Sequence, residues 1–255
     1  MFLAFDVGNT NITFGAYRGE ELLFTSRIAT DTMRMEDQYA VEIKNIYDIR
    51  TANPDEKPEG AIVSSVVPQL SQRLCKAVKK ALGITPLILG PGVKTGLDIR
   101  IDNPAQLGAD LVAGAVSAVA RYPYPCVVCD LGTATTISII DKEGHMRGGS
   151  IHTGIQTSLN ALVDRTSLLP QVSIDAPKSV IGTNTVDSIK SGLIFGTAAM
   201  LDGMILRIEK ELGSRVNVVA TGGLAEEVIK HCSSEVIYDE NLVLDGLRII
   251  YCKNR

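Results

Sequence analysis

Tryptophan is absent from this chain of 255 residues, and only 5% of the residues are aromatic. Lysine and arginine form no basic run, and the formal net charge is −4 at pH 7. We therefore expect no nucleic acid and no anionic membrane surface as the main partner. No apolar run approaches the length that crosses a membrane. The N-terminus leads directly into a predicted strand, so we also expect no signal peptide.

Cysteine is scarce, and its odd number argues against a disulfide framework. The five cysteines are Cys75, Cys126, Cys129, Cys232 and Cys252. Scattered through apolar surroundings, they are typical of the reduced thiols of a cytoplasmic protein. The motif "CVVC" at 126–129 suggests a redox or metal site, but positions i and i+3 of a strand point to opposite faces. We therefore predict two buried thiols there.

Apolar residues make up 45% of the chain, which suits a well-packed protein. The 23 glycines indicate many tight turns. Hydrophobic periodicity and turn residues divide the chain into two halves with one pattern. The first half has predicted strands at 2–7, 11–17 and 21–29, a helix at 35–50, a Pro-rich loop at 52–60, a strand at 61–67, a helix at 69–82, a strand at 86–89 and a helix from about 108.

The second half follows the prolines of "RYPYP" at 121–125. Its predicted elements are strands at 126–132, 135–141 and 146–151, helices at about 154–165 and 185–212, a strand at 216–221, a helix from 223, and a last strand and helix. Each half thus has three hairpin-connected strands followed by alternating helices and strands. This pattern predicts an α/β protein with a mixed sheet flanked by helices in each domain, 1–118 and 119–255.

The first two strands of each half are joined by similar turns, "DVGNTNITFGAY" at 6–17 and "DLGTATTISIID" at 130–141. At a constant offset of 124, the matched positions are Asp6 with Asp130, Gly8 with Gly132, Asn9 with Thr133 and Asn11 with Thr135. A glycine turn with small polar residues exposes backbone N–H groups that bind phosphate. The preceding carboxylate is able to hold a metal ion against that phosphate. One such loop is no more than a hairpin, but the matched pair indicates phosphate binding.

A third element supports a nucleotide site. The strand "VNVVAT" ends in Thr221, and Gly222 and Gly223 open a helix. Two glycines let a flat ligand approach the backbone closely. Alone this signal is weak, because it is not the dinucleotide fingerprint, and it gains weight from its position after two phosphate loops.

The order of these motifs resembles one family. An Asp-x-Gly-Asn-Thr hairpin, a "GAD" helix start, an Asp-x-Gly-Thr hairpin, "GG-I" before a helix and a late Thr-Gly-Gly are similar to those of type III pantothenate kinases. That family belongs to the actin-like, sugar-kinase and Hsp70 ATPase superfamily, and the resemblance covers essentially the whole chain. It implies two RNase H-like domains and ATP-dependent phosphorylation of pantothenate to 4′-phosphopantothenate, the first step of coenzyme A biosynthesis.

The resemblance also implies an ATP site with Mg²⁺ and a monovalent cation, K⁺ or NH₄⁺. Asp6 would hold Mg²⁺ through water, and Asp130 would hold the monovalent cation. The residues expected to contact ATP are Asp6, Val7, Gly8, Asn9, Thr10, Asn11, Ile12, Thr13, Gly132, Thr133, Gly222 and Gly223.

On the acceptor side, the resemblance implies that Asp110 is the general base. Such a carboxylate accelerates phosphoryl transfer by about 10²–10⁴-fold. On the sequence alone, the competing interpretation is an acidic residue stabilised by about 0.3–1 kcal/mol in the first turn of a helix. The residues expected in the pantothenate pocket are Ile101, Gly108, Ala109, Asp110, Leu111 and Thr185.

The resemblance further implies a homodimer with the substrate pocket near the subunit interface. Gly192, Gly196 and Gly203 in the predicted long helix permit close packing, including packing of another subunit.

Three positions depart from the family pattern, all on the acceptor side. Leu111 stands where an Arg usually follows the catalytic Asp, Ile101 where a Tyr is common, and Thr153 where a Pro usually precedes the glycine. Loss of the Arg bond costs about 1.5–3 kcal/mol and loss of the Tyr bond about 0.5–1.5 kcal/mol. Together they weaken pantothenate binding by roughly 30- to 2000-fold unless other groups replace them.

Three interpretations follow from these departures. The protein is a pantothenate kinase in which His152, Lys94 or Arg100 meets the substrate carboxylate, or a kinase of a different small alcohol, or a non-catalytic nucleotide-binding regulator. The retained carboxylates favour chemistry, because each is costly in a cleft unless it is paired or metal-bound. His145, in the turn "KEGH", is predicted to be solvated, and no spacing of histidine and cysteine supports zinc.

Overall fold

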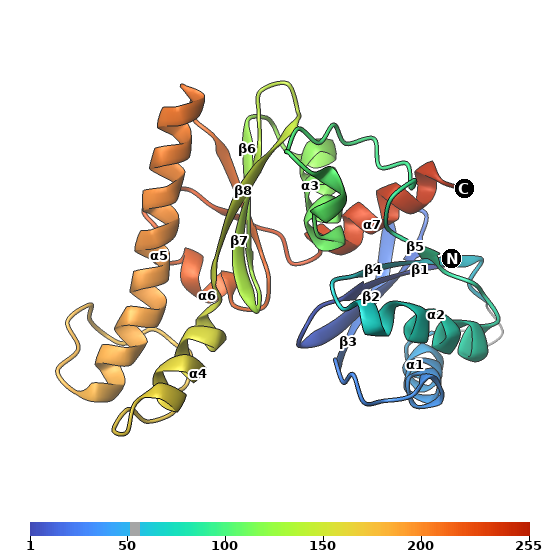
Figure 1. Ribbon diagram of the computed structural model, residues 1–255, viewed down its shortest axis with the longest axis horizontal. Helices are drawn as coiled ribbons and strands as arrows, with labels where there is room; N and C mark the ends of the chain where they lie inside the picture. The colour runs from blue at the N-terminus through green and yellow to red at the C-terminus, as the bar shows by residue number, and fades with distance from the viewer. Residues whose placement is uncertain (52–56) are drawn as a thin grey trace. The chain divides into compact units, whose positions relative to one another are not determined.

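The computed structural model describes residues 1–51 and 57–255 (Figure 1). Residues 52–56 of the predicted Pro-rich loop lie outside this description. The chain forms two compact units. Unit 1 comprises Met1–Gly96, Asn103–Ser117 and Leu242–Arg255, and unit 2 comprises Leu97–Asp102 and Ala118–Asn241. The end of the chain thus belongs to unit 1, and the assignment of ATPase domains to 1–118 and 119–255 stays a prediction.

Unit 1 contains a five-stranded mixed sheet. Its strands are β1 (Phe2–Val7), β2 (Asn11–Arg18), β3 (Glu21–Ala29), β4 (Gly60–Ser65) and β5 (Leu87–Ile88). Their order is β3-β2-β1-β4-β5, with an antiparallel meander of β1 to β3 and parallel pairing of β1 with β4 and of β4 with β5. Alternate residues of β1 to β4 point to opposite faces of the sheet. The two faces pack against different helices.

Two helices cover one face of this sheet, α1 (Glu36–Arg50) and α2 (Pro68–Leu82) (Figure 1). The core between the sheet and these two helices contains Leu3, Phe5, Val7, Ile12, Phe14, Tyr39, Ile43, Leu70 and Leu74. Proline is the first residue of α2, where its missing N–H costs nothing, and Gly83 ends the helix with a positive φ of 75°.

The opposite face of the same sheet packs against α7 (Leu242–Lys253), the last helix of the chain. Tyr17 Oη donates a hydrogen bond to Asp245 at 2.9 Å, and the rings of Phe2 and Tyr251 stack at 4.6 Å. Within unit 1, α7 also lies against α3 (Ala109–Arg121), because Gly246 approaches the backbone of Ala113 too closely for any side chain. The C-terminal helix therefore joins the β1–β2 hairpin to the start of α3.

Unit 2 repeats the same sheet. Its strands are β6 (Cys126–Leu131), β7 (Ala134–Ile140), β8 (Met146–Thr153), β9 (Asn217–Thr221) and β10 (Ile237–Tyr238). Their order, β10-β9-β6-β7-β8, is that of unit 1 read from the other edge, with β6 to β8 antiparallel and β6, β9 and β10 parallel. The predicted α/β class with a three-stranded meander opening each half is confirmed.

The core of unit 2 lies between this sheet and α4 (Ile155–Arg165), α5 (Thr185–Leu212) and α6 (Ala225–Ile229) (Figure 1). Helix α5 begins at the cap residue Asn184, whose side chain accepts the N–H of Asp187, and ends at Gly213 with a φ of 68°. Its most apolar window has a mean hydropathy of 1.4 and is 39% buried, so by length and composition this helix is able to cross a membrane. One such helix is weak evidence of a membrane span, because the core helix of a protein in water has the same length and composition.

Candidate active site

The first predicted phosphate loop is a hairpin turn in unit 1. Asp6 and Val7 end β1, and β2 begins at Asn11. The Gly8 N–H donates to the Asn11 carbonyl at 2.9 Å, and Thr30 Oγ1 donates to the Gly8 carbonyl at 2.7 Å. The side chains of Val7 and Ile12 are fully buried in the core. These two residues are therefore available to a ligand only through their backbone, whereas Asn9, Thr10 and Asn11 are exposed.

The second predicted loop is a shorter turn in unit 2. Leu131 pairs with Thr135 across this turn, whereas Val7 pairs with Ile12 across the first, so the second turn has one residue fewer. Accordingly, the Gly132 N–H donates to the Ala134 carbonyl at 3.1 Å, as Gly8 does to Asn11. The predicted match of Asn11 with Thr135 is wrong: Ala134 takes the place of Asn11, and the buried Thr135 takes that of Ile12.

Two glycines hold the second loop from outside the hairpin. Gly222 has a φ of 99°, and a Cβ there would lie 2.7 Å from both Asp130 Oδ1 and the Leu131 carbonyl oxygen. Gly154 leaves no room for a side chain against the carbonyls of Gly132 and Thr133, and its N–H donates to Thr133 O at 3.2 Å. The structure therefore brings Asp130, the Gly132 turn and Gly222 together, because β6 and β9 are parallel neighbours that end side by side. Gly223 follows at the exposed start of the helix.

Each carboxylate lies between two hydroxyl residues on neighbouring strands. Asp6 is directly opposite Thr13 on β2 and Ser64 on β4. Asp130 is directly opposite Thr136 on β7 and Thr221 on β9. Residues directly opposite one another in a sheet point to the same face.

These flanking hydroxyls were missed in the sequence. The adjacent serines at the end of the apolar strand "AIVSSVV" were a signal of the same kind as Asp6. Ser64 and Thr136 have buried hydroxyl oxygens without a hydrogen-bond partner among the described residues. Oxygen donors of this kind, with a carboxylate, suit Mg²⁺ with its water shell at Asp6 and a monovalent cation at Asp130.

The predicted catalytic residue, Asp110, stands in the first turn of α3. Its Oδ1 accepts the N–H of Leu111 at 2.8 Å, and the carboxylate approaches Gly108 too closely for a Cβ there. Burial raises the pKa of the Asp110 carboxyl above its ordinary value of 3.8, and backbone hydrogen bonds oppose the rise. A carboxylate with a raised pKa is a stronger proton acceptor than an exposed one. Asp110 is half-buried, and so are its neighbours in the chain, Gly108, Ala109 and Leu111.

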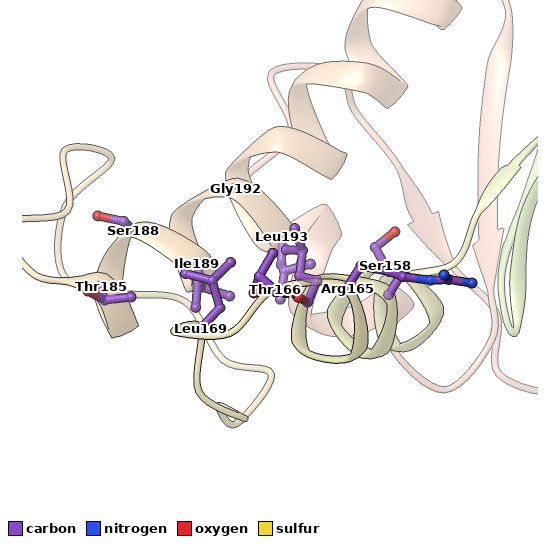
Figure 2. A pocket seen from close by; sticks show the side chains of 11 residues that line it. Ser158, Arg165, Thr166, Leu169, Thr185, Ser188, Ile189, Gly192 and Leu193 are labelled. Carbon is purple, nitrogen blue, oxygen red and sulfur yellow. Dashed lines mark hydrogen bonds between the residues drawn. The ribbon is translucent and has the colours of Figure 1, made fainter.

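The other predicted acceptor residues belong to unit 2. Ile101 Cγ2 lies within van der Waals reach of Gly148, at 3.8 Å from the position of a Cβ there. Thr185 begins α5 and lines an open pocket of about 620 Å³ between α4 and α5 (Figure 2). The rest of the lining has the polar residues Ser158, Arg165, Thr166 and Ser188 among apolar ones such as Leu162, Leu169 and Ile189. The predicted acceptor residues are thus divided between the two units.

The groups suggested as partners of the substrate carboxylate have contacts of their own. Arg100 binds Asp98 Oδ2 at 3.1 Å and His145 Nε2 at 3.0 Å, and His152 Nε2 lies 2.9 Å from Ser150 Oγ. The backbone of Lys94 is held by Asn254.

His145 is not a solvated turn residue as predicted. Its side chain is 18% exposed, and its Nδ1 lies 3.3 Å from Asp141 Oδ1. Asp141, Glu143 and His145 approach one another closely enough to bind a metal, but Arg147 and Arg100 already pair with this group of side chains. We therefore describe it as an ion-pair network.

The "CVVC" motif is confirmed as a pair of buried thiols. Cys126 and Cys129 are 0% and 1% exposed, and both are free. Burial raises the pKa of each thiol to about 12. Because the thiolate is the reactive form, neither residue suits redox chemistry or metal binding at neutral pH.

Comparison with known proteins identifies close relatives along the entire chain. The family model for type III pantothenate kinase matches residues 2–207. The type III pantothenate kinase of Halalkalibacterium halodurans is 41% identical over 254 residues, with 100% of each chain covered. That of Myxococcus xanthus is 43% identical over 254 residues, covering 100% of this chain and 99% of the relative.

Solved structures show the same fold at lower identity. A Baf family protein from Campylobacter jejuni has a TM-score of 0.61 at 23% identity, covering 99% of this chain and 98% of its own. The inorganic polyphosphate/ATP-glucomannokinase of Arthrobacter sp. strain KM has a TM-score of 0.52 at 14% identity, with 99% and 98% covered. The predicted actin-like ATPase fold with two RNase H-like sheets is confirmed.

Proposed function

The chain belongs to the type III pantothenate kinase family and phosphorylates pantothenate in coenzyme A biosynthesis, and we propose that Asp110 is the general base of this transfer. The observation that carries the proposal is the position of this half-buried carboxylate in the first turn of α3, where burial raises its pKa. In the reaction, the primary hydroxyl oxygen of pantothenate bonds to the γ-phosphorus of ATP, the bond to the bridging oxygen breaks, and ADP leaves. Asp110 accepts the hydroxyl proton as the new bond forms.

In each unit, the proposed contacts to the phosphates of ATP are the exposed residues of the hairpin turn, Asn9, Thr10 and Asn11 in unit 1 and Gly132 and Thr133 in unit 2. Gly222 and Gly223, at the end of β9, allow the nucleotide to approach the backbone. Asp6 would hold Mg²⁺ through water, and this ion neutralises charge on the phosphate oxygens when bound. The supporting observation is the set of oxygen groups on one sheet face, Asp6 with Thr13 and Ser64.

Asp130 is the proposed ligand of a monovalent cation, K⁺ or NH₄⁺. Thr136 and Thr221 flank it on the same sheet face, and the hydroxyl of Thr136 is buried without a partner among the described residues. We expect turnover in potassium or ammonium to exceed turnover in sodium, with the difference abolished by Asp130→Asn.

The residues proposed to contact pantothenate are Gly108, Ala109 and Leu111 beside Asp110 in unit 1, and Ile101 and Thr185 in unit 2. Leu111 and Ile101 offer no charge to the carboxylate of pantothenate. A kinase of another small alcohol would show turnover only with that alcohol. A nucleotide-binding regulator would bind ATP without turnover on any acceptor.

We further propose a cytoplasmic homodimer that forms through α5. Gly192 and Gly196 are exposed, and a Cβ at either position would meet nothing within 4 Å. Leu206 on the same helix is 59% exposed. Light scattering of a Gly196→Glu variant should show a monomer where the native chain shows a dimer.

A coupled assay of ADP release tests the activity. It compares the native chain with Asp110→Asn, with and without pantothenate, in potassium and in sodium. Turnover that requires pantothenate and is lost in the variant supports the assignment of the general base. An Asp110→Asn variant with native turnover would refute it, even if the protein is a pantothenate kinase.

A further inference from the structure

Ser64 is a buried polar residue at the end of β4 that the fold itself leaves unsatisfied. Its side chain is 0% exposed, and its Oγ has no hydrogen-bond partner among the described residues. A buried hydroxyl without a partner destabilises a folded protein. Such a group is typical of a site where the missing partner belongs to a ligand or its water.

Its place in the sheet indicates which ligand. Ser64 is directly opposite Asp6, and both residues lie on the sheet face that packs against α7, away from the core of α1 and α2. In unit 2, the residue opposite Asp130 on the equivalent parallel strand is Thr221, also a hydroxyl. The two sheets therefore place a hydroxyl beside each carboxylate at the same position.

The neighbouring serine behaves differently. Ser65 Oγ accepts the Val67 N–H at 3.1 Å and lies 3.1 Å from the Val67 carbonyl oxygen, to which it donates. These contacts satisfy Ser65 within the turn that leads into α2. Of these two adjacent serines, only Ser64 lacks a hydrogen-bond partner among the described residues.

We propose that Ser64 is a positioning residue for the metal–nucleotide complex. When Mg²⁺ and nucleotide are bound, the Ser64 Oγ would accept a hydrogen bond from a water of the ion that Asp6 holds, and its O–H would donate to the Asp6 carboxylate, a bond that Ser64 does not make in the ligand-free structure. This inference rests on the proposed role of Asp6. Ser64 fixes the orientation of that carboxylate and contributes nothing to acceptor binding.

The test separates this role from a merely structural one. Ser64→Ala and the matched control Ser65→Ala are compared by thermal unfolding without ligand. Ser64→Ala should be as stable as the native chain or more stable, because an unsatisfied buried hydroxyl is removed. Ser65→Ala should be less stable, because it loses the bonds to Val67.

Calorimetric titration with a non-hydrolysable ATP analogue then measures binding with Mg²⁺ and with EDTA. Ser64→Ala should weaken Mg²⁺-dependent binding by about 10-fold, leave binding in EDTA unchanged and leave the KM for pantothenate unchanged. Ser64→Thr, which restores the hydroxyl, should recover native Mg²⁺ dependence. Ser65→Ala should bind as the native chain does.

The proposal is overturned if Ser64→Ala loses stability without ligand, or if its binding in Mg²⁺ equals that of the native chain. Asp6→Asn distinguishes the two levels of inference. If Asp6→Asn loses Mg²⁺-dependent binding and Ser64→Ala does not, only the role of Ser64 fails. If neither variant loses it, the proposed role of Asp6 fails as well.

Discussion

The backbone of Gly222 lies directly against the carboxylate of Asp130, so that a Cβ at Gly222 would be 2.7 Å from Asp130 Oδ1. Gly222 also has a φ of 99°, a conformation that residues with side chains rarely adopt. Two strands that are distant in the sequence therefore meet here without space for a methyl group. The first glycine of the Thr-Gly-Gly motif is therefore needed for this approach in the ligand-free protein, before any nucleotide binds.

Gly222→Ala should displace the Asp130 loop and weaken ATP binding by at least about 10-fold, besides lowering stability by at least about 1 kcal/mol. Gly213→Ala is the matched control: its φ of 68° is also positive, but a Cβ there meets nothing within 4 Å. It should lose stability and keep native ATP affinity. Equal ATP affinity in both variants, measured by calorimetry, would contradict the importance of this contact.

Asp110→Asn should lower kcat by about 10²–10⁴-fold with little change in ATP affinity. The raised pKa of Asp110 also predicts an acid limb, since kcat/KM falls as pH drops through that pKa and the base becomes protonated. The profile of kcat/KM against pH for the native chain, with Asp110→Glu as a comparison, measures this limb. A profile that stays flat down to about pH 4, the ordinary pKa of an Asp, would argue against Asp110 as the base.

The same raised pKa has a consequence for stability. Because the folded pKa of Asp110 lies above the unfolded value, the ionised carboxylate destabilises the fold at neutral pH. This cost disappears as the pH falls through the folded pKa toward the unfolded one. Asp110→Asn should therefore be as stable as the native chain or more stable at pH 7, and the difference should vanish in acid. Thermal unfolding at several pH values checks the sign.

Leu111→Arg tests the altered acceptor pocket. A guanidinium there should strengthen pantothenate binding by about 10- to 150-fold if it reaches the substrate carboxylate, which a lower KM would show. The positive charge beside Asp110 should also lower the pKa of that carboxyl, so the acid limb should move to lower pH. Leu111→Met, which keeps an apolar side chain, should leave both values unchanged. An unchanged KM in Leu111→Arg would place the substrate carboxylate elsewhere.

Thiol reactivity tests the buried interpretation of "CVVC". Cys252 on α7 is exposed, whereas Cys126 and Cys129 are buried and have pKa values of about 12. In the native protein a thiol reagent should label Cys252 rapidly and the other two only after unfolding. Cys252→Ser should remove the rapid phase of labelling. The absorbance of the coloured group that the reagent releases on reaction with a thiol measures this phase. Rapid labelling of Cys126 in that variant would be inconsistent with the packed strand.

The sequence by itself determined the two-fold repeat and the residues at its turns. Alternation of apolar residues and the glycine turns after Asp6 and Asp130 are local properties of the chain, so strand positions and both loops could be predicted from them. The buried thiols followed from the same alternation, because side-chain direction in a strand depends only on position.

Only the tertiary structure decided how these pieces meet. The pairing of β6 with β7 showed that the second turn is shorter and that Ala134, not Thr135, corresponds to Asn11. The division of the chain into units showed that α7 belongs to unit 1. The pairing of β1 with β4 showed that Ser64 stands beside Asp6. Strand register and the partner of each side chain depend on contacts between residues far apart in the sequence, which local patterns do not contain.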